Sequence, residues 1–345
     1  MKKSLTICLM LLVVFALKVR AQEPLKLVAR TPMPGFSGDF DHFAVDLKGH
    51  RLFLAAEEHK TVEVFDLQTG KRIHSITGFG DPHMMVYLPN SNNLIVTDGD
   101  SPDDPEPHFG MVELVSGKDY KILGTIKLPP IVDHAVFNPV NKYYYVQSGT
   151  DKGSKTHMVN IIDTKTFKHV GDIDGIPGEE NEAMTIDRAG KKLYLNLTGT
   201  DEVGVIDLNT RQLIARWPLP DAHVAHGIAL DESNHRLFTA TRKPPKFIAF
   251  DTDTGKVIAD LPCVDVNSDM WFDAAHKRIY VTGSETTSVF KQIDADHYEH
   301  VTEVATAYRA KSSILVPQLN RLYVAVSSKG KAGAQMALQI YDAQP

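Results

Sequence analysis

Short apolar stretches alternate with polar turns along the whole chain, and one such pattern recurs seven times. Each copy is an apolar stretch, a turn usually marked by Asp or Pro, and a second stretch rich in Leu, Tyr and Val, as in HFAVDLKGHRLFLA and HGIALDESNHRLFT. The alternation and the β-branched and aromatic residues predict strands, and no long amphipathic helix is evident. The copies begin at His42, His83, His134, Glu182, His226, Asp269 and Lys311.

A second pattern follows the first in at least four copies: VEVFDLQTGK, VNIIDTKTFK, VGVIDLNTRQ and FIAFDTDTGK. The Asp caps a turn locally and the Gly of two copies supplies a positive φ, so this pattern predicts a hairpin between two further strands. Each unit therefore holds about four strands. Successive units start 41, 51, 48, 44, 43 and 42 residues apart, which is typical of the blades of a β-propeller.

The seventh unit has room for only three strands before Pro345. The strand-like run at residues 25–33 (LKLVARTPM) belongs to no unit, and we expect it to supply the missing outer strand. Such closure protects the sheet edges that an open array would expose. The sequence thus predicts an all-β chain, a seven-bladed β-propeller of four-stranded antiparallel blades closed by an N-terminal strand. Six blades and a stray element are the alternative.

The first residues have the features of a secretory signal peptide. Lys2 and Lys3 precede an apolar run, and Val19-Arg20-Ala21 offers small residues for cleavage after Ala21. We expect residues 1–21 to be a signal peptide and residues 22–345 a single domain, in a periplasmic or secreted bacterial protein. An uncleaved anchor is the alternative. Cleavage would change the net charge from −6 to −10, and an acidic chain without a basic run is a poor candidate for nucleic-acid binding.

The phrases RLYVAV, VGVIDLNT and HGIALDESNHRLF resemble the repeats of the YVTN or YncE-like β-propellers, which are secreted bacterial seven-bladed proteins. The resemblance covers residues 25–345 and implies the fold. It implies no reaction, because propellers of similar architecture include lactonases, metal-dependent hydrolases and polysaccharide lyases. The sequence also has no C-x-x-C-H haem motif and no G-x-S-x-G nucleophile motif.

The repeats align the starts of the innermost strands, which meet at one mouth of a propeller's channel. Imidazoles and carboxylates are enriched there, and these groups are natural ligands for Zn, Cu, Mn or Fe. The cofactor hypothesis is therefore a divalent metal: Zn, Cu or Mn in this ring, or Ca at the acidic loop of residues 98–110. The candidate residues are His42, His83, His134 and His226 as metal ligands, Asp41, Asp133 and His223 as ligand-binding residues, Glu182 and Asp269 as general bases, and Lys311 as a partner for a substrate carboxylate.

A purely structural role is the alternative for this ring, because polar side chains at such positions also hydrogen-bond neighbouring blades and channel water. The copies are also offset by one residue. His42, His134 and Asp269 lie four residues before the aligned turn position, whereas His83, Glu182 and His226 lie five before it. Adjacent residues of a strand face opposite ways, so a real offset predicts that three of these six point away from the ring.

Three functions follow from these features, of which metal or redox handling in the periplasm has the ring as its only support. The first is an exported binding protein that holds a small molecule or a protein ligand at one propeller face. We expect it to be a monomer, with no membrane span after signal cleavage. The alternative is a metal-dependent hydrolase, lactonase or lyase that uses the ring. The sequence holds no complete catalytic signature, so whether the protein is an enzyme stays open.

Overall fold

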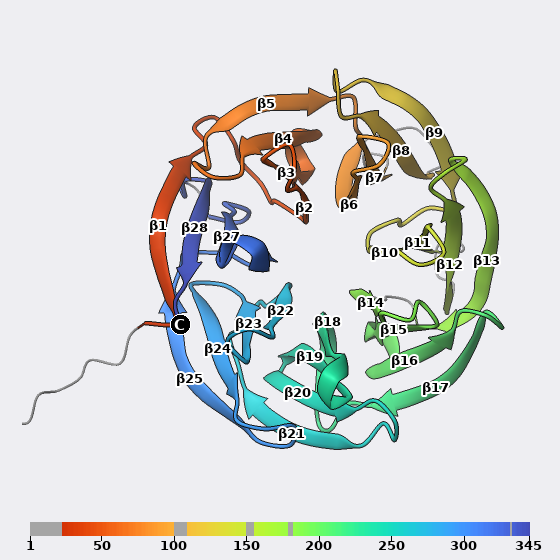
Figure 1. Ribbon diagram of the computed structural model, residues 1–345, viewed down its shortest axis with the longest axis vertical. Coiled ribbons are helices and arrows are strands. Elements are labelled where there is room, and N and C mark those ends of the chain that lie inside the picture. The colour runs from red at the N-terminus through yellow and green to blue at the C-terminus, as the bar shows by residue number, and fades with distance from the viewer. Residues whose placement is uncertain (1–22, 100–108, 150–154, 179–181, 332) are drawn as a thin grey trace, which may run out of the picture.

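The computed structural model describes residues 23–99, 109–149, 155–178, 182–331 and 333–345. These residues form seven four-stranded antiparallel sheets around a central channel (Figure 1). The predicted all-β, seven-bladed propeller is confirmed. Helix in the described residues is limited to single 3-10 turns: η1 (Glu57–His59), η2 (Thr198–Thr200), η3 (Glu232–Asn234) and η4 (Pro317–Leu319). The predicted signal peptide, residues 1–21, lies outside the described residues.

The first three blades follow the chain from the innermost strand to the outermost. Blade 1 contains β2 (Phe43–Asp46), β3 (Arg51–Ala56), β4 (Thr61–Asp66) and β5 (Arg72–Thr77). Blade 2 contains β6 (Asp81–Leu88), β7 (Asn93–Gly99), β8 (Gly110–Ser116) and β9 (Ile122–Leu128). Blade 3 contains β10 (Ala135–Asn138), β11 (Tyr143–Ser148), β12 (Thr156–Asp163) and β13 (Lys168–Pro177).

The next three blades repeat this order. Blade 4 contains β14 (Met184–Ile186), β15 (Lys192–Leu197), β16 (Glu202–Asp207) and β17 (Gln212–Pro218). Blade 5 contains β18 (His223–Asp231), β19 (Arg236–Lys243), β20 (Pro245–Asp251) and β21 (Val257–Pro262). Blade 6 contains β22 (Met270–Asp273), β23 (Arg278–Thr282), β24 (Thr286–Gln292) and β25 (Tyr298–Ala305).

Blade 7 joins the two ends of the described chain. It contains β26 (Ser312–Val316), β27 (Arg321–Val326), β28 (Ala337–Ala343) and, outermost, β1 (Leu25–Pro32). β1 runs antiparallel to β28, with Leu25 opposite Ala343 and Pro32 opposite Ala337. The predicted closing strand is thus confirmed, and Figure 1 shows the red N-terminal strand beside the blue C-terminal one.

The Asp-marked turns form as predicted. In the turn after β4, Asp66 Oδ1 accepts hydrogen bonds from the backbone N–H of Gln68 (3.2 Å) and of Thr69 (2.8 Å). Gly70 follows with a φ of +68°, which a residue without a side chain adopts at low cost. The same bonding recurs after β20, so the repeated phrase fixes the direction in which the outermost strand returns.

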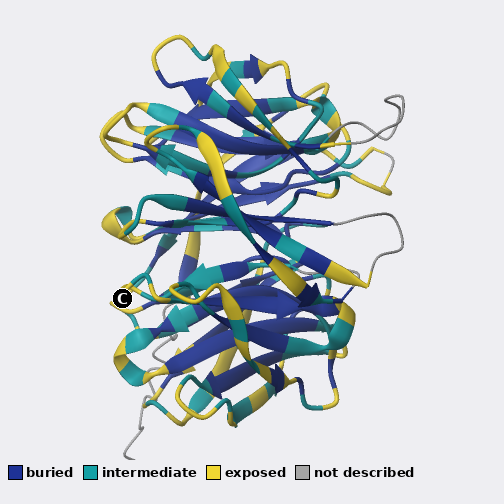
Figure 2. Ribbon diagram, turned by 90° about the vertical axis from the view of Figure 1, so that its right-hand side faces the viewer, coloured by how far each residue is buried: buried dark blue, intermediate teal, exposed yellow. Residues whose placement is uncertain are grey.

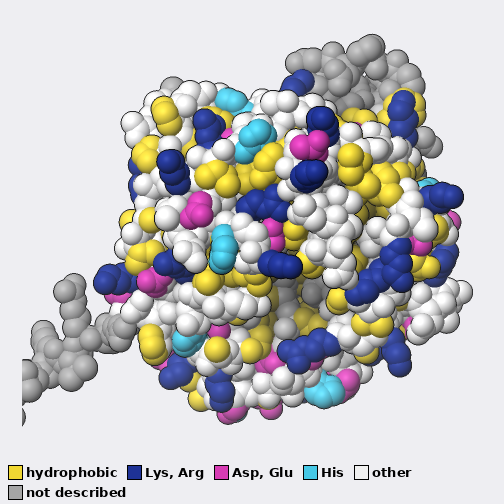
Figure 3. Space-filling model, turned by 45° about the horizontal axis from the view of Figure 1, so that its top comes forward, with side chains coloured by type: hydrophobic (Ala, Val, Ile, Leu, Met, Phe, Trp, Pro, Cys, Tyr) yellow, Lys and Arg dark blue, Asp and Glu magenta, His cyan; other side chains and the backbone are white. Residues whose placement is uncertain are grey.

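The hydrophobic core lies between neighbouring blades, where each sheet packs on the next. One cluster, for example, combines Tyr280 and Val289 of blade 6 with Leu322 and Tyr341 of blade 7 and with Leu25 of the closing strand. Buried residues run along the middle strands, and exposed residues gather in the loops (Figure 2). On the face seen in Figure 3, charged side chains of both signs are interspersed with hydrophobic ones. Within the described residues, no helix has the length and hydropathy to span a membrane.

Closure of the ring is testable with a matched pair of substitutions in β1. Leu25 is 1% exposed against blade 7, whereas Leu27 on the same strand is 48% exposed. Leu25→Ala should lower the free energy of unfolding by about 2–4 kcal/mol, because it leaves a cavity in a packed core. Leu27→Ala should change it by no more than about 0.5 kcal/mol. Urea denaturation of the two variants measures this, and equal losses would contradict the closing role of β1.

Candidate functional site

Five of the innermost strands, those of blades 1, 2, 4, 5 and 6, begin with a β-bulge, in which two consecutive residues lie opposite one residue of the neighbouring strand. The ladder skips in this way in β6 and in β18. Before β2, the Asp41 N–H donates to the Ala55 carbonyl at 3.0 Å, and the Ala55 N–H donates back to the His42 carbonyl at 3.0 Å. The same pair of bonds precedes β14 and β22. Both bulge residues reach the channel, so the predicted turning away of half of the ring does not occur.

The bulges arrange the ring in two stacked tiers. The first bulge residue of each blade, or its equivalent, lines a polar cavity of about 210 Å³ at the channel mouth. The second lines the channel beneath it. The upper tier is Asp41, His83, Asp133, Glu182, His226, Ser268 and Lys311. The lower tier is His42, Met84, His134, Ala183, Gly227 and Asp269.

Buried polar side chains on the second strand of one blade hold the start of the next blade's innermost strand. Asn196 in β15 donates its Nδ2–H to the His226 carbonyl at 2.7 Å. Thr282 in β23 donates its hydroxyl to the Lys311 carbonyl at 2.8 Å, and Thr97 in β7 does the same for blade 3 at 3.0 Å. Each such bond contributes about 1 kcal/mol. These side chains share the blade-to-blade bonding with the ring itself, in which Asp269 Oδ2 accepts the Ser313 N–H of blade 7 at 2.7 Å.

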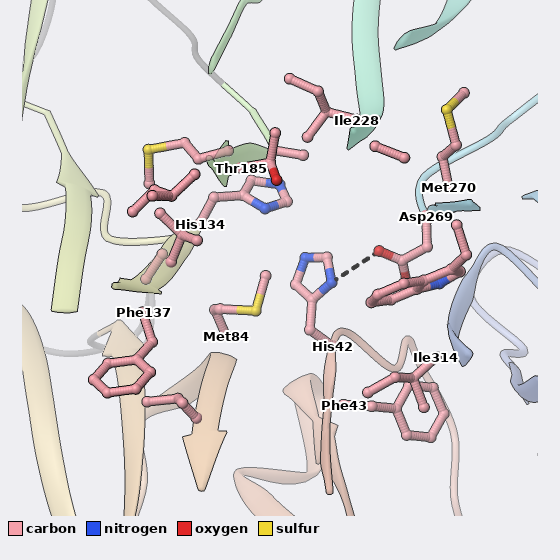
Figure 4. Close-up of a pocket in the computed structure, with 18 of the residues that line it drawn as sticks. His42, Phe43, Met84, His134, Phe137, Thr185, Ile228, Asp269, Met270 and Ile314 are labelled. Atoms are coloured by element: carbon pink, nitrogen blue, oxygen red, sulfur yellow. Dashed lines mark ion pairs between the residues drawn. The ribbon is translucent and has the colours of Figure 1, made fainter. Parts of the chain in front are cut away.

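Asp41 links the two tiers. Its Oδ2 lies 2.8 Å from His83 Nδ1, and its Oδ1 lies 3.3 Å from His42 Nε2. His42 Nδ1 in turn lies 3.2 Å from Asp269 Oδ1 (Figure 4). The His42 and His134 rings are 4.7 Å apart between centroids. Three carboxylate–imidazole contacts and one ring contact therefore join blades 1, 2, 3 and 6 across the channel.

Glu182 forms the second centre of the cluster. Its Oε2 lies 2.7 Å from His134 Nε2 and 3.1 Å from His226 Nδ1. Asp133 is looser, with carboxylate oxygens 3.9 Å from His83 Nδ1 and 4.0 Å from His134 Nε2, and its side chain is 35% exposed. Asp133 is therefore the member of the cluster that is freest to take a ligand.

The carboxylates hold two of the imidazoles in their protonated forms. Burial disfavours the charge on His42, but Asp41 and Asp269 outweigh burial and raise its pKa to about 9. Burial is likewise outweighed at His83, where the Asp41 hydrogen bond and the Asp133 charge raise the pKa to about 10. The same two imidazoles overcome the burial of Asp41 and hold its pKa well below the usual range.

The blade 4 side of the cluster behaves differently. Burial of Glu182 is outweighed by its hydrogen bonds with His134 and His226, which hold its pKa well below the usual range. The pKa of His134 is raised because Asp133 and Glu182 outweigh burial. At His226 burial prevails over Glu182 and lowers the pKa. Glu182 therefore carries its negative charge between one imidazole that favours a proton and one that does not.

Two sets of three side chains have donor atoms close enough to share a metal ion. One is His42, Asp133 and His134, and the other is Asp41, His83 and Asp133. Within each set, the nitrogen and oxygen atoms all lie within 4.8 Å of one another. His134 Nδ1 is also buried, and it has no hydrogen-bond partner in the described part of the chain. Asp133 belongs to both sets.

The cavity also contains charged groups that sequence reasoning missed. Arg242, Arg309 and Lys329 line the side of the cavity nearest Lys311, together with Asp39 and Glu57. None of these five begins a repeat, so aligning the starts of the innermost strands does not find them. Burial raises the pKa of Glu57 to about 7, and the charges of Asp41 and Glu58 act in the same direction. The predicted Lys311 lies among these groups, with its Nζ 3.7 Å from Asp39 Oδ2.

Beneath the lower tier, the channel is a larger and mostly apolar space of about 670 Å³. Figure 4 shows Met84, Phe137 and Ile228 around it together with His42 and His134, and His134 also lines the polar cavity. Past the far ends of the innermost strands, Arg188 Nε lies 3.0 Å from Glu232 Oε2. The channel therefore has chemically distinct halves.

Two sequence predictions fall outside this cluster. His223 does not line the cavity; it is exposed, and its Nδ1 lies 2.6 Å from Asp201 Oδ2. The calcium hypothesis concerned the acidic loop of residues 98–110, of which residues 100–108 lie outside the described part of the chain. Asp98, at its start, is buried and accepts hydrogen bonds from the backbone N–H groups of Gly80 and Asp81.

Comparison with known proteins supports the fold alone. No family model and no curated protein sequence matches this chain. Among solved structures, the chain is similar to Kuenenia stuttgartiensis hydrazine synthase, with a TM-score of 0.69 and 17% sequence identity. The match covers 88% of this chain and 98% of that chain. An identity this low shows a shared propeller architecture and carries no inference about activity.

The pKa shifts predict how the stability of the metal-free protein depends on pH. The raised pKa values of His42 and His83 add stability that is complete below about pH 6.5 and is lost as the pH rises through 9 to 10. The lowered pKa values of Asp41 and Glu182 add stability that is complete above about pH 4.5 and is lost in acid. The thermal midpoint should therefore be highest between about pH 5 and 6.5 and fall by several degrees toward pH 9.5.

Asp41→Asn removes the carboxylate that contacts both His42 and His83, so the thermal midpoint of this variant should fall less between pH 6.5 and 9.5. His223→Ala should preserve the wild-type decline, because His223 lies outside the cluster. Differential scanning calorimetry at a series of pH values measures both variants. A wild-type midpoint that does not change between pH 6 and 9.5 would show that the contacts do not set these protonation states.

Proposed function

We propose that this protein is an exported, monomeric, YncE-like binding protein that holds a divalent transition-metal ion at the mouth of its channel. The observation that carries the proposal is the pair of donor sets, His42–Asp133–His134 and Asp41–His83–Asp133, that meet at one half-exposed carboxylate. Export is supported by the features of residues 1–21. The repeat phrases support the YncE-like assignment, and a closed ring that needs no partner for its sheets supports the monomer.

The donor chemistry favours Zn, Cu or Mn over Ca. Each set mixes imidazole nitrogen with carboxylate oxygen, whereas Ca prefers six to eight oxygen ligands. Three protein donors leave a coordination position open for a small molecule. Within the described residues, His134 Nδ1 has no hydrogen-bond partner, so this imidazole keeps a nitrogen that no protein group engages. The site is thus suited to bind a metal together with a ligand from solution.

The alternative proposal is a metal-dependent hydrolase, lactonase or lyase, and one observation bears on which residue would be its base. Glu182 Oε2 is already engaged by two imidazoles, and Asp269 Oδ2 accepts the Ser313 N–H at 2.7 Å. Glu57 lines the same cavity with a pKa of about 7, which suits a general base. On this alternative, Glu57→Gln abolishes lactone hydrolysis by the metal-loaded protein without changing its metal content. Hydrolysis that survives the substitution would exclude Glu57 as the base.

Metal content tests the main proposal directly. Mature protein purified without a His-tag and incubated with Zn, Cu or Mn should retain close to one ion per chain by inductively coupled plasma mass spectrometry. Asp133→Asn removes the carboxylate common to both donor sets, so retention should fall by at least about tenfold. His223→Ala, an exposed imidazole outside the cluster, is the matched control and should retain the wild-type amount. Wild-type protein that retains none of the three metals would overturn the proposal.

A further inference from the structure

The polar cavity has a cationic side, formed by Lys311 before β26, Arg309 two residues earlier, and Arg242 near the end of β19. Asp39 is the only carboxylate in the described residues within 4.0 Å of these three cations. Its Oδ2 lies 2.5 Å from Arg309 Nη2 and 3.7 Å from Lys311 Nζ. Within 4.0 Å, the three positive charges therefore have one negative charge between them, which leaves two positive charges without a carboxylate partner at that distance.

The hydrogen-bond donors on this side are also underused. Lys311 is only 9% exposed, yet within the described residues its ammonium donates no hydrogen bond. Arg309 Nε is buried and has no hydrogen-bond partner among the residues that the structure describes. Arg242 donates from Nε to the Asn267 carbonyl at 2.7 Å, and its two terminal nitrogens have no protein acceptor in the described part of the chain. Of these donors, Arg309 Nε is fully buried, and a buried donor without an acceptor costs free energy. Lys311 and Arg242 line the cavity, where an anion would accept their remaining N–H groups.

Lys329 does not belong to this surplus. Its Nζ lies 2.8 Å from Glu58 Oε1 and 3.5 Å from Glu57 Oε1, so it is matched by two carboxylates at the rim. The unmatched charge is confined to Arg242, Arg309 and Lys311. The planar end of Arg242 suits a carboxylate group, which can accept two parallel N–H bonds from one guanidinium.

The other side of the same cavity carries acceptors. Asp41, Asp133 and Glu182 line it, and Asp133 is the least engaged of the three. Carboxylate oxygens accept hydrogen bonds from hydroxyl groups and repel a second anion. A ligand that satisfies both sides therefore carries a carboxylate at one end and hydroxyls at the other. The volume of about 210 Å³ corresponds to roughly seven water molecules, which is on the order of a monosaccharide.

We propose that the cavity binds a small hydroxycarboxylic acid of the sugar-acid type, its carboxylate on Arg242, Arg309 and Lys311 and its hydroxyls on Asp133 and its neighbours. This inference rests on the proposed function in that it uses the same cavity as the binding site. It does not require the metal, because both the cationic donors and the carboxylate acceptors belong to the protein.

Isothermal titration calorimetry of mature protein, freed of metal on a chelating resin so that no soluble polycarboxylate is added, tests the proposal. The probes are glucuronate and gluconate, with glucose lacking the carboxylate and acetate lacking the hydroxyls. At least one sugar acid should bind, and glucose and acetate should each bind at least about tenfold more weakly. Failure of both sugar acids to bind, or equal binding of glucose or acetate, would overturn the proposal without reference to any variant.

Substitutions then locate the site. Lys311→Met and Arg242→Gln should each weaken sugar-acid binding by at least about thirtyfold, because each removes a positive charge that would contact the ligand carboxylate. Lys121→Met, which also removes one positive charge but from an exposed pair with Asp119, is the matched control and should leave binding unchanged. Wild-type affinity in folded Lys311→Met and Arg242→Gln variants would place the ligand elsewhere and refute the assignment.

The outcomes for metal and for sugar acid are separable. Metal retention is measured without any sugar acid, and sugar-acid binding is measured without metal. A protein that retains no metal but binds glucuronate through Lys311 would refute the proposed metal site and support this inference. The reverse result would refute this inference alone.

Discussion

The chemistry of the channel mouth depends on how each innermost strand begins. A regular strand would present one side chain per blade to the channel and turn its neighbour into the sheet. The bulges instead bring two consecutive residues of a blade to the axis, and buried side chains such as Asn196 and Thr282 hold the backbone there. The blades therefore supply seven residues to the upper tier and six to the lower tier. Without the bulges, His42 and Asp41 could not both face the cluster.

Charge balance is the second constraint on this arrangement. Burying a carboxylate or an ammonium is costly unless an opposite charge lies close by. On one side of the cavity the cost is offset by alternating carboxylates and imidazoles, as in the contact of Asp41 with His42 and His83. On the other side the offset is incomplete, because within the described residues Asp39 is the one carboxylate within 4.0 Å of Arg242, Arg309 and Lys311. The cavity is therefore polarised across its width, and this polarity favours a ligand with two chemically different ends.

The fold could be predicted from the sequence because the residues that specify each strand and turn lie close together in the chain and recur in every repeat. Each copy of the repeat specifies its own strands and turns, and the count of strands left one place for residues 25–33. The enrichment in His and acidic residues at the mouth was visible for the same reason. The two tiers could not be predicted. A bulge is defined by how a strand pairs with its neighbour, and from the sequence alone its one-residue offset cannot be told from a misaligned repeat. His223 resembled its neighbour His226 in sequence but belongs to the rim, where Asp201 holds it.

The cationic side was beyond sequence reasoning for a different reason. Arg242, Arg309 and Asp39 occupy three different positions relative to the repeat, and Asp39 precedes the first copy. Only the closing of the ring brings blade 7 next to blade 1 and places Arg309 Nη2 against Asp39. Contacts that form only when blade 7 meets blade 1 are not part of the repeat, so aligning the repeats does not reveal them.

The sharing of blade 7 between the two ends of the chain also sets an order of events during folding. Blades 1 to 6 each pair strands that are near in sequence, so each can form from its own residues, but β1 has no partner until β28 has been made. In a chain synthesised from its N-terminus, and threaded outward in that direction if it is exported, this first strand waits through nearly the whole process. An unpaired strand is prone to pair with other chains. Charged residues and proline on an edge strand discourage such pairing, and β1 has Lys26 and Arg30 at exposed positions and Pro32 at its end.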